Sequence, residues 1–164
     1  MEYLKGQQEK EAIQWMKEAA KIAEKARCLR AKCGTVIVKD GEIIGKGYNA
    51  PPLDKEENRM CDKEFGPGKP KYDKTCCMHA EWRAIIDALR KNPEKLKGSR
   101  LYFTRVAENG EIKKSGKPLC TVCSRMALDT GIDKFVLWHE DGIREYPTDE
   151  YDRLSYEYVH PEQG

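Results

Sequence analysis

The 164-residue sequence lacks the features of several common protein classes. No apolar run reaches the roughly 18 residues that a transmembrane helix needs, so we expect no membrane contact. The N-terminal segment MEYLKGQQEK is charged and has no apolar stretch of the secretory type, which predicts a cytoplasmic protein. Thirty Lys and Arg residues against 28 Asp and Glu residues leave a net charge of +2. This balance excludes a strongly basic nucleic-acid coat protein and an acidic tail protein.

The sequence also has no internal repeat and no low-complexity segment. Its length predicts a single domain over residues 1–164, large enough to bury about 70% of its unfolded surface without cross-links. Seven cysteines are present. In the absence of a secretory signal, we expect them to be reduced thiols that serve metal binding or catalysis rather than a disulfide framework.

Hydrophobic periodicity and turn residues predict the element order α-β-β-α-β-α-β, followed by a tail. The expected helices cover about 7–27, 78–91 and 120–130, the expected strands 34–39, 42–48, 101–104 and 134–138, and a short helix is possible over 148–159. A long loop is expected at about 50–76 and a polar insertion at about 105–118. A hairpin followed by βα alternation predicts an α/β fold of three layers, α/β/α, with a mixed sheet of about five strands and helices on both faces.

Two short motifs carry the chemistry, and each lies where a helix is predicted to begin. The first is His79-Ala80-Glu81, and the second is Cys120-Thr-Val-Cys123. Residues i and i+3 share a helix face, so both sulfurs can approach one ion, and the positive helix N-terminus favours thiolates. Two thiolates and the His79 imidazole would fill three corners of a zinc tetrahedron and leave the fourth for water, as catalytic zinc requires.

Glu81 gives this predicted metal site a function. Its carboxylate, two residues after His79 at a helix start, could take a proton from the water and deliver it to a leaving nitrogen. A closed structural zinc site needs no such proton carrier. The alternatives are a non-catalytic zinc-binding module and a thiol-disulfide protein built on Cys120 and Cys123. The His-x-Glu and Cys-x-x-Cys motifs together favour zinc-dependent hydrolysis.

The motif pair resembles that of the zinc-dependent cytidine and deoxycytidylate deaminase superfamily. The resemblance extends from about Cys28 to Trp138, and the hairpin 33–49 is similar to the deoxycytidylate (dCMP) deaminase branch. It implies that His79, Cys120 and Cys123 bind Zn²⁺, that Glu81 is catalytic, and that Asn49 and the backbone of Ala80 bind the substrate. It further implies a cytidine-deaminase-like fold and a homo-oligomer. The chain departs from the family pattern at three places. Leu119 separates the proline from the first cysteine, and the insertion before Cys120 is longer than in the family. Trp82 follows Glu81 directly, and we expect it in the core or at an interface.

The resemblance also raises a second, structural zinc site. Some members of this branch use one cysteine before the first strand and another in the loop after the hairpin, which correspond to Cys28 and Cys61. Cys77 or its neighbour Cys76 could be a third ligand. Such an ion would hold a polar loop that has little apolar surface of its own. The alternative is that these cysteines are small buried apolar residues.

The predicted function is therefore hydrolytic deamination of a cytosine-type base to a uracil-type base with release of ammonia. Lysines in the two loops before the motifs, at positions 69, 71, 74, 113, 114 and 117, would attract a phosphate or remain merely solvated. The near-neutral net charge favours a small nucleotide or nucleoside substrate, with a free nucleotide such as dCMP first. The alternatives are another base (guanine, adenosine in tRNA, a pterin- or riboflavin-type intermediate) or cytosine in single-stranded nucleic acid, which is less favoured.

Overall fold

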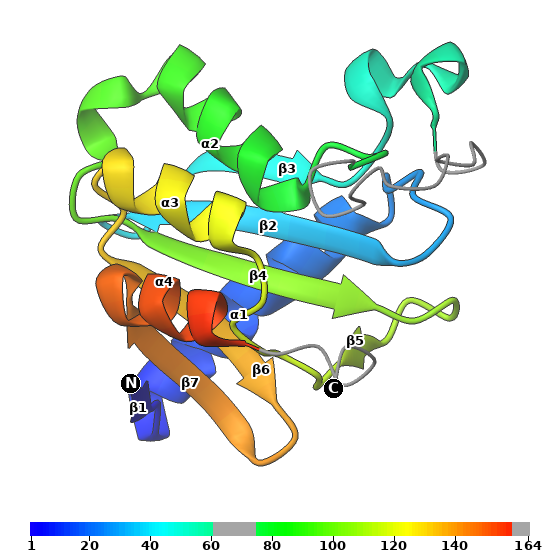
Figure 1. Cartoon of the computed structure of the whole chain (residues 1–164). Coiled ribbons are helices and arrows are strands. Elements are labelled where there is room, and N and C mark those ends of the chain that lie inside the picture. Colours follow the sequence, from blue (N-terminus) through cyan, green and yellow to red (C-terminus); the bar gives the residue numbers. More distant parts are fainter. Residues whose placement is uncertain (61–74, 159–164) are drawn as a thin grey trace.

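The structure, a computed structural model, describes residues 1–60 and 75–158. A central sheet separates helix α1 on one face from α2, α3 and α4 on the other (Figure 1). The helices are α1 (Gly6–Ala23), α2 (Ala80–Lys91), α3 (Thr121–Asp129) and α4 (Thr148–Glu157), and the short 3-10 turns are η1 (Pro52–Asp54), η2 (Glu56–Asn58) and η3 (Pro93–Lys95). The predicted three-layer α/β/α architecture is confirmed.

The sheet is mixed, but it has seven strands in the described residues rather than about five. They are β1 (Glu2–Tyr3), β2 (Lys32–Lys39), β3 (Glu42–Tyr48), β4 (Arg100–Val106), β5 (Ile112–Lys113), β6 (Lys134–His139) and β7 (Gly142–Pro147). Their order is β1-β7-β6-β4-β2-β3, with β5 beside β4, and only the β4–β6 pair is parallel.

The sequence does not predict β1, β5 or β7, because none of them has a clear alternating pattern. Strands β1 and β5 have two residues each, and their pairing depends on distant partners. Strand β7 contains Glu145, which is buried in the fold. Its carboxylate accepts a 2.8 Å ion-pair contact from Arg100 Nε on β4, so the charge is compensated only in the folded sheet.

The β2–β3 hairpin follows the prediction from Asp40-Gly41. Both residues have positive φ angles, 50° and 75°, as a two-residue hairpin turn with the twist of its strands requires. Helix α1, by contrast, ends at Ala23 and not near Arg27. The Arg27 N–H donates instead to the carbonyl oxygen of Asn49 at 2.9 Å, so a tertiary contact ends the helix earlier than its composition predicts.

Glycines bring α2 very close to β3. A Cβ atom on Gly47 would lie 2.0 Å from the Ala80 carbonyl oxygen, and one on Gly45 would lie 2.4 Å from that of Ala84. Backbone can approach backbone this closely only where no side chain intervenes. The contact fixes the first turn of α2, and with it the His79-Ala80-Glu81 motif, against the end of β3.

Two apolar clusters, one on each face of the sheet, complete the core. One joins α2, α3 and α4 to the sheet around Phe135, which is fully buried and stacks on Tyr151 at 4.0 Å. The other joins α1 to the opposite face through Met16 and Val36. Among the described residues, no helix is both long and apolar enough to cross a lipid bilayer.

Candidate active site

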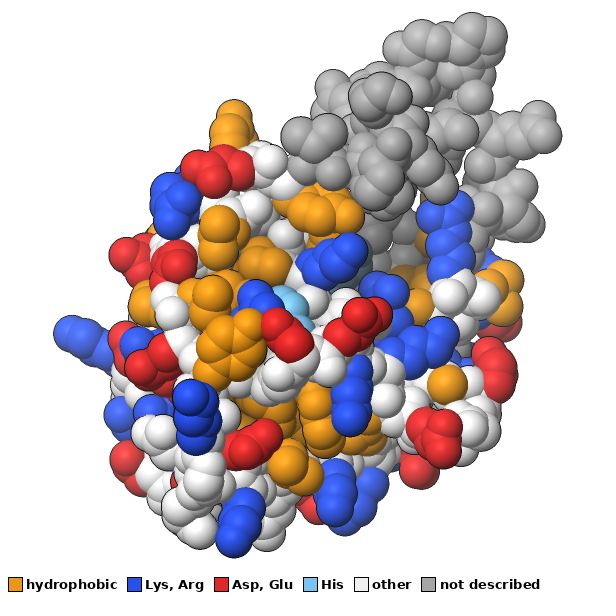
Figure 2. All heavy atoms as spheres, turned by 90° about the horizontal axis from the view of Figure 1, so that it is seen from below, with side chains coloured by type: hydrophobic (Ala, Val, Ile, Leu, Met, Phe, Trp, Pro, Cys, Tyr) orange, Lys and Arg blue, Asp and Glu red, His pale blue; other side chains and the backbone are white. Residues whose placement is uncertain are grey.

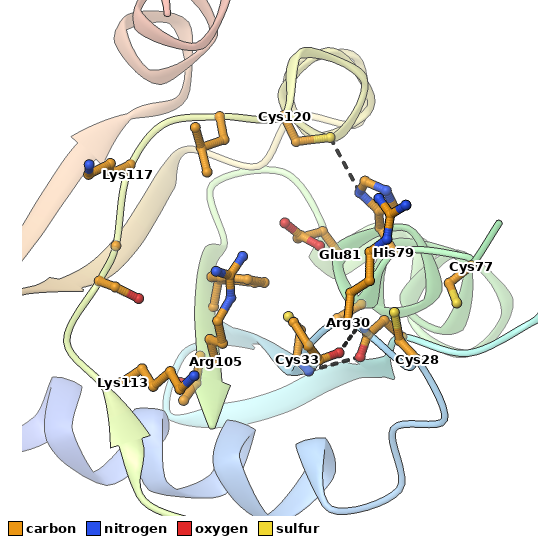
Figure 3. Close-up of a pocket in the computed structure, with 18 of the residues that line it drawn as sticks. Cys28, Arg30, Cys33, Cys77, His79, Glu81, Arg105, Lys113, Lys117 and Cys120 are labelled. Atoms are coloured by element: carbon orange, nitrogen blue, oxygen red, sulfur yellow. Dashed lines mark hydrogen bonds between the residues drawn. The ribbon is translucent and has the colours of Figure 1, made fainter. Parts of the chain in front are cut away.

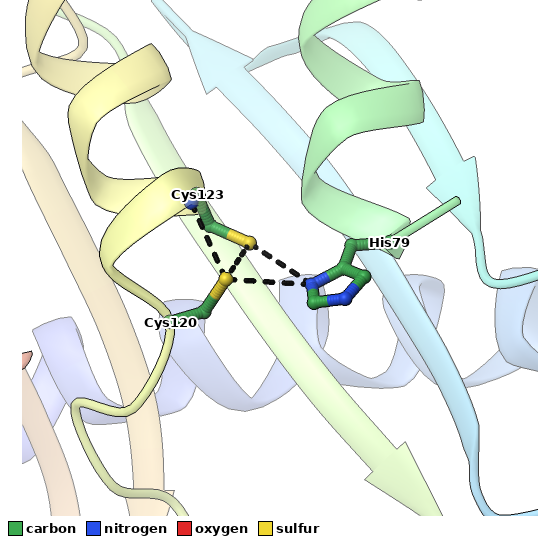
Figure 4. Close-up of side chains that lie close together, drawn as sticks. All are labelled: His79, Cys120 and Cys123. Carbon is green, nitrogen blue, oxygen red and sulfur yellow. Dashed lines mark hydrogen bonds between the residues drawn. The ribbon is translucent and has the colours of Figure 1, made fainter. Parts of the chain in front are cut away.

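The N-termini of α2 and α3 bring the two sequence motifs together. His79 and Cys120 each occupy the residue just before the first helical turn, with extended backbone. The Nδ1 atom of His79 lies 3.2 Å from the Cys123 sulfur and 3.4 Å from the Cys120 sulfur (Figure 4). Residues 41 positions apart in sequence thus converge on one point, as the motif spacing predicted.

This donor set suits a zinc ion. One imidazole nitrogen and two thiol sulfurs are the ligands that zinc prefers, and in tetrahedral geometry nitrogen and sulfur ligands are about 3.5 Å apart. The two sulfurs are 2.6 Å apart, so they would separate by about 1 Å to bind the same ion. Within the described part of the chain, His79, Cys120 and Cys123 form the one group of three or more potential metal ligands.

The electrostatics of the group already favour a thiolate. The hydrogen bond from the Cys123 thiol, supported by His79, lowers the pKa of Cys120 to about 5 against the opposing effect of burial. The backbone N–H of Cys123 also donates to the Cys120 sulfur at 3.3 Å. Burial raises the pKa of Cys123, so this thiol keeps its proton until a cation replaces it.

Glu81 lies next to the three potential ligands in the first turn of α2 (Figure 3). Its side chain is only 6% exposed, and burial raises the pKa of its carboxyl group. A carboxyl group with a raised pKa can accept a proton and release it again near neutral pH. Its position, in the wall of a cavity and beside the metal-ligand group, is the one that a proton carrier needs.

The site opens into a cavity of about 670 Å³, a volume suited to a small molecule of nucleotide size. Four cationic residues line it, Arg30, Arg105, Lys113 and Lys117, whereas Glu81 is the one acidic residue in the described lining. Figure 3 shows Arg30 on the side of α2, and Lys113 and Lys117 on the opposite side, along the insertion. The cavity therefore combines a buried carboxylate near the potential metal ligands with a positively charged outer wall.

Asn49 and Ala80, the predicted substrate-binding residues, both line this cavity. The Asn49 side chain is almost fully buried and already makes two hydrogen bonds within the protein. Its Oδ1 accepts from the backbone N–H of Cys33 at 2.8 Å, and its Nδ2 donates to the Ala31 carbonyl oxygen at 2.7 Å. Asn49 thus holds the start of β2 to the end of β3, in addition to any contact it makes with a substrate.

The cysteines predicted for a second zinc are only partly described. Cys28 and Cys77 carry free thiols close enough to shift each other's pKa, and Cys61 lies outside the described residues. Burial and the Cys28 contact raise the pKa of Cys77 to about 11. Burial would also raise the pKa of Cys28, but donors that include the N–H groups of Arg30 and Ala31 lower it. Cys76 is disulfide-bonded, so the expectation of reduced thiols fails at this residue.

Some residues of the cavity could not have been found from the sequence. Arg30 and Arg105 come from segments far apart in the chain, and only the β2–β4 pairing brings them to the same cavity. The predicted polar insertion contains strand β5, which pairs with the end of β4 through Ile112 and Lys113. The sequence identifies the lysines of this insertion, but their distance from the metal-ligand group depends on that pairing.

Known proteins share both the sequence pattern and this fold. A family model described as the cytidine and deoxycytidylate deaminase zinc-binding region matches residues 9–139. Deoxycytidylate deaminase of Mycobacterium phage D29 is 32% identical over 125 residues, which cover 72% of this chain and 86% of the phage protein. Deoxycytidylate deaminase of Saccharomyces cerevisiae is 30% identical over 125 residues, which cover 74% of this chain but 35% of the yeast protein.

Solved structures agree with the sequence comparisons. The dCMP deaminase of cyanophage S-TIM5, crystallised with dCMP and dUMP, superposes with a TM-score of 0.55 at 25% identity, over 80% of this chain and 82% of the phage chain. A cytidine deaminase from Burkholderia pseudomallei gives a TM-score of 0.56 at 16% identity, over 85% and 94% of the two chains. At that identity the second likeness establishes the fold alone.

Proposed function

This chain belongs to the zinc-binding cytidine and deoxycytidylate deaminase family, and from that premise we propose that it hydrolyses dCMP to dUMP and ammonia. The observation that carries the proposal is the convergence of His79, Cys120 and Cys123 beside the buried Glu81 at the end of a nucleotide-sized cavity. A thiol-disulfide protein would need neither the imidazole nor the carboxylate there.

In the proposed mechanism, His79, Cys120 and Cys123 hold the zinc ion, and Glu81 moves protons. Bound zinc supplies a water molecule whose pKa is lowered towards neutrality, and so a nucleophile for C4 of the base. The Glu81 carboxylate accepts the proton of the attacking water and transfers it to N3. It then takes the second proton of the former water from the hydroxyl on C4 and delivers it to the departing amino group, so that cytosine and water become uracil and ammonia.

The charge of the cavity supports a nucleotide over a nucleoside. Arg30, Arg105, Lys113 and Lys117 line the same cavity as Glu81, with Lys113 and Lys117 on the side away from α2 (Figure 3). A 5′-phosphate would meet several cations in a partly enclosed space, where charge–charge attraction is stronger than in bulk water. Acidic and basic side chains are interspersed over the described part of the face drawn in Figure 2, whereas a polynucleotide site typically has a continuous basic stripe.

Ammonia release from a panel of substrates tests the proposal. The zinc-loaded protein would be incubated with dCMP, dCTP, deoxycytidine, cytosine, dGMP, dAMP and a single-stranded oligodeoxycytidine. We expect dCMP to have the highest kcat/KM and deoxycytidine to be far poorer. Preference for the nucleoside, or for the oligonucleotide, would refute the nucleotide assignment. Zinc binding with no turnover on the whole panel would indicate a non-catalytic module.

The second zinc remains part of the proposal. In the reduced protein, Cys28 and Cys77 would supply two of its ligands and Cys61 a third. Metal analysis of the protein purified under reducing conditions would give two zinc ions per chain, falling to one in Cys28→Ser. One ion per chain in the unmodified protein would refute the second site.

We also propose that the protein is a cytoplasmic homo-oligomer of a single domain. Apolar side chains are exposed on the outer layer of helices, among them Leu89 on α2 and Val122 and Leu128 on α3. A subunit contact over these helices would remove the side chains from water, which is favourable. Sedimentation velocity should give a mass that is a multiple of 18.9 kDa, and a monomer over the accessible concentration range would contradict this.

A further inference from the structure

His79 is held from two sides by residues that the proposed mechanism does not use. The indole ring of Trp82 stacks on the imidazole, with a centroid distance of 4.3 Å and an angle of 7° between the planes. The Thr75 Oγ1 atom lies 3.3 Å from His79 Nε2, the ring nitrogen on the opposite side from the sulfurs. The imidazole thus has a contact on its face and another at its outer edge.

The contact with Thr75 determines the position of the imidazole proton. The Thr75 hydroxyl donates its single hydrogen to the carbonyl oxygen of Cys77 at 3.0 Å, so its oxygen can only accept from His79. The donor must then be an Nε2–H group, so in the neutral imidazole the nitrogen that is free to bind a metal ion is Nδ1. Nδ1 is the atom directed at the sulfurs of Cys120 and Cys123, so this tautomer is the one that can bind a metal ion there.

The contact with Trp82 determines the plane of the ring. Trp82 is three residues after His79 and therefore lies over the same side of the α2 N-terminus. Its own Nε1–H is buried and has no hydrogen-bond partner among the described residues, which costs stability. The indole contributes through its face, where it restricts rotation of the imidazole and keeps Nδ1 directed at the sulfurs.

We propose that Thr75 and Trp82 are positioning residues that hold His79 as the Nε2–H tautomer with Nδ1 directed at the zinc ion. The inference rests on the zinc site of the proposed function. It extends that site by two residues outside the His-x-Glu and Cys-x-x-Cys motifs, and neither of them contacts the substrate in the proposed mechanism.

Zinc release and the spectrum of the cobalt-substituted protein test the inference without relying on activity. Thr75→Val removes the hydroxyl acceptor at nearly constant volume, whereas Thr75→Ser keeps it. Trp82→Leu removes the aromatic face, whereas Trp82→Phe keeps an aromatic ring. Trp15→Leu, on α1, is the matched control. We expect Thr75→Val and Trp82→Leu to release zinc to a chelator roughly 10–100 times faster and to shift the visible bands of bound Co²⁺. Thr75→Ser, Trp82→Phe and Trp15→Leu should stay close to the unmodified protein.

Equal release rates and an unchanged cobalt spectrum in Thr75→Val and Trp82→Leu would overturn the inference. The inference would also be overturned if Thr75→Ser and Trp82→Phe released zinc as fast as Thr75→Val and Trp82→Leu, because that pattern indicates only disturbed packing. If Trp82→Leu does not fold, the Thr75 pair and Trp82→Phe decide the question. An unmodified protein that binds zinc but deaminates no substrate refutes the proposed function alone, whereas one that binds no zinc refutes both.

Discussion

At the residue scale, the environment of Glu81 suits its proposed role in proton transfer rather than in metal binding. Its carboxyl group is buried beside the potential zinc ligands but belongs to a different position in the helix turn, so it can face the reacting water while they hold the ion. The same burial raises its pKa, which suits repeated uptake and release of a proton.

Glu81→Gln should therefore retain zinc but lose turnover. The amide has nearly the same shape as the carboxyl group, but it cannot accept the proton of the attacking water. We therefore expect kcat to fall by roughly 10²–10⁴-fold. Metal analysis and ammonia release on one preparation check this. Glu108→Gln, on an almost fully exposed side chain, is the control. Activity within ten-fold of the unmodified enzyme would contradict the assigned role.

Asn49 illustrates a residue whose contacts within the protein are as important as its proposed contact with substrate. Asn49→Ala leaves the Cys33 N–H and the Ala31 carbonyl without their partners, and we expect a loss of about 1–3 kcal/mol in the free energy of unfolding. Denaturant unfolding measures this directly. Asn109→Ala, on an exposed turn, should change it by less than about 0.5 kcal/mol. A raised KM with unchanged stability would mean that Asn49 acts on the substrate alone.

At the element scale, the glycines of β3 control the position of α2. Helix α2 carries His79 and Glu81 at its first turn, and its backbone lies against Gly45 and Gly47 with no room for a side chain. Small movements of this helix would therefore displace two of the four residues in the proposed catalytic group. The site depends on the closeness of one helix–strand contact.

Gly47→Ala should destabilise the protein and weaken zinc binding together. The added Cβ would fall 2.0 Å from the Ala80 carbonyl oxygen and 2.4 Å from the Ala84 nitrogen, so α2 must move outwards. We expect the free energy of unfolding, measured with denaturant, to fall by about 1–3 kcal/mol. We also expect zinc to be released faster to a chelator. Gly41→Asn, in the turn of the same hairpin, is the control because its φ of 75° suits asparagine and no atom lies within 4 Å of an added Cβ. Unchanged zinc release in Gly47→Ala would argue against this coupling.

The insertion shows how an element outside the common motifs contributes to the cavity. Strand β5 pairs with β4, and the Gly116 N–H donates to the Trp138 carbonyl oxygen on β6 at 2.9 Å. Lys114 lies over the Trp138 ring, 5.3 Å from its centroid. These contacts hold Lys113 and Lys117 at the cavity, so the insertion forms part of its wall.

At the scale of the whole molecule, charge is nearly balanced overall but locally positive at the cavity. The net charge is +2, yet four cations and a single acidic residue are among the described residues that line the cavity. Attraction of an anionic substrate must then come from this local arrangement rather than from the total charge.

Salt should therefore weaken dCMP binding but not deoxycytidine binding. Raising ionic strength from about 0.05 M to about 0.5 M shortens the screening length severalfold, and we expect KM for dCMP to rise by a similar factor. Lys113→Ala should reduce this dependence, whereas Lys91→Ala, at the far end of α2, should not. An equal salt effect on both substrates would show that the cations do not contact the phosphate.

Removal of zinc should lower the stability of the whole fold. The ion would join the N-termini of α2 and α3, where one imidazole and two thiols already meet. Binding to the native state alone stabilises it by about 4 kcal/mol when free zinc is 1,000 times the Kd. Thermal unfolding with and without a chelator measures the change, and Cys120→Ser should reproduce the chelated curve. A melting temperature independent of chelator would contradict a zinc site at these helices.

Much of this protein could be predicted from local sequence patterns. The alternation of apolar residues, the Asp40-Gly41 turn and the two motifs at predicted helix starts specify the main strands, the helices and the proposed catalytic group, because each depends on spacing within a few residues. Only the tertiary structure decided the rest. The short strands β1 and β5, the compensated Glu145 of β7, the early end of α1, the four cations at one cavity and the stacking of Trp82 on His79 all require partners far along the chain or a packing geometry that composition does not encode.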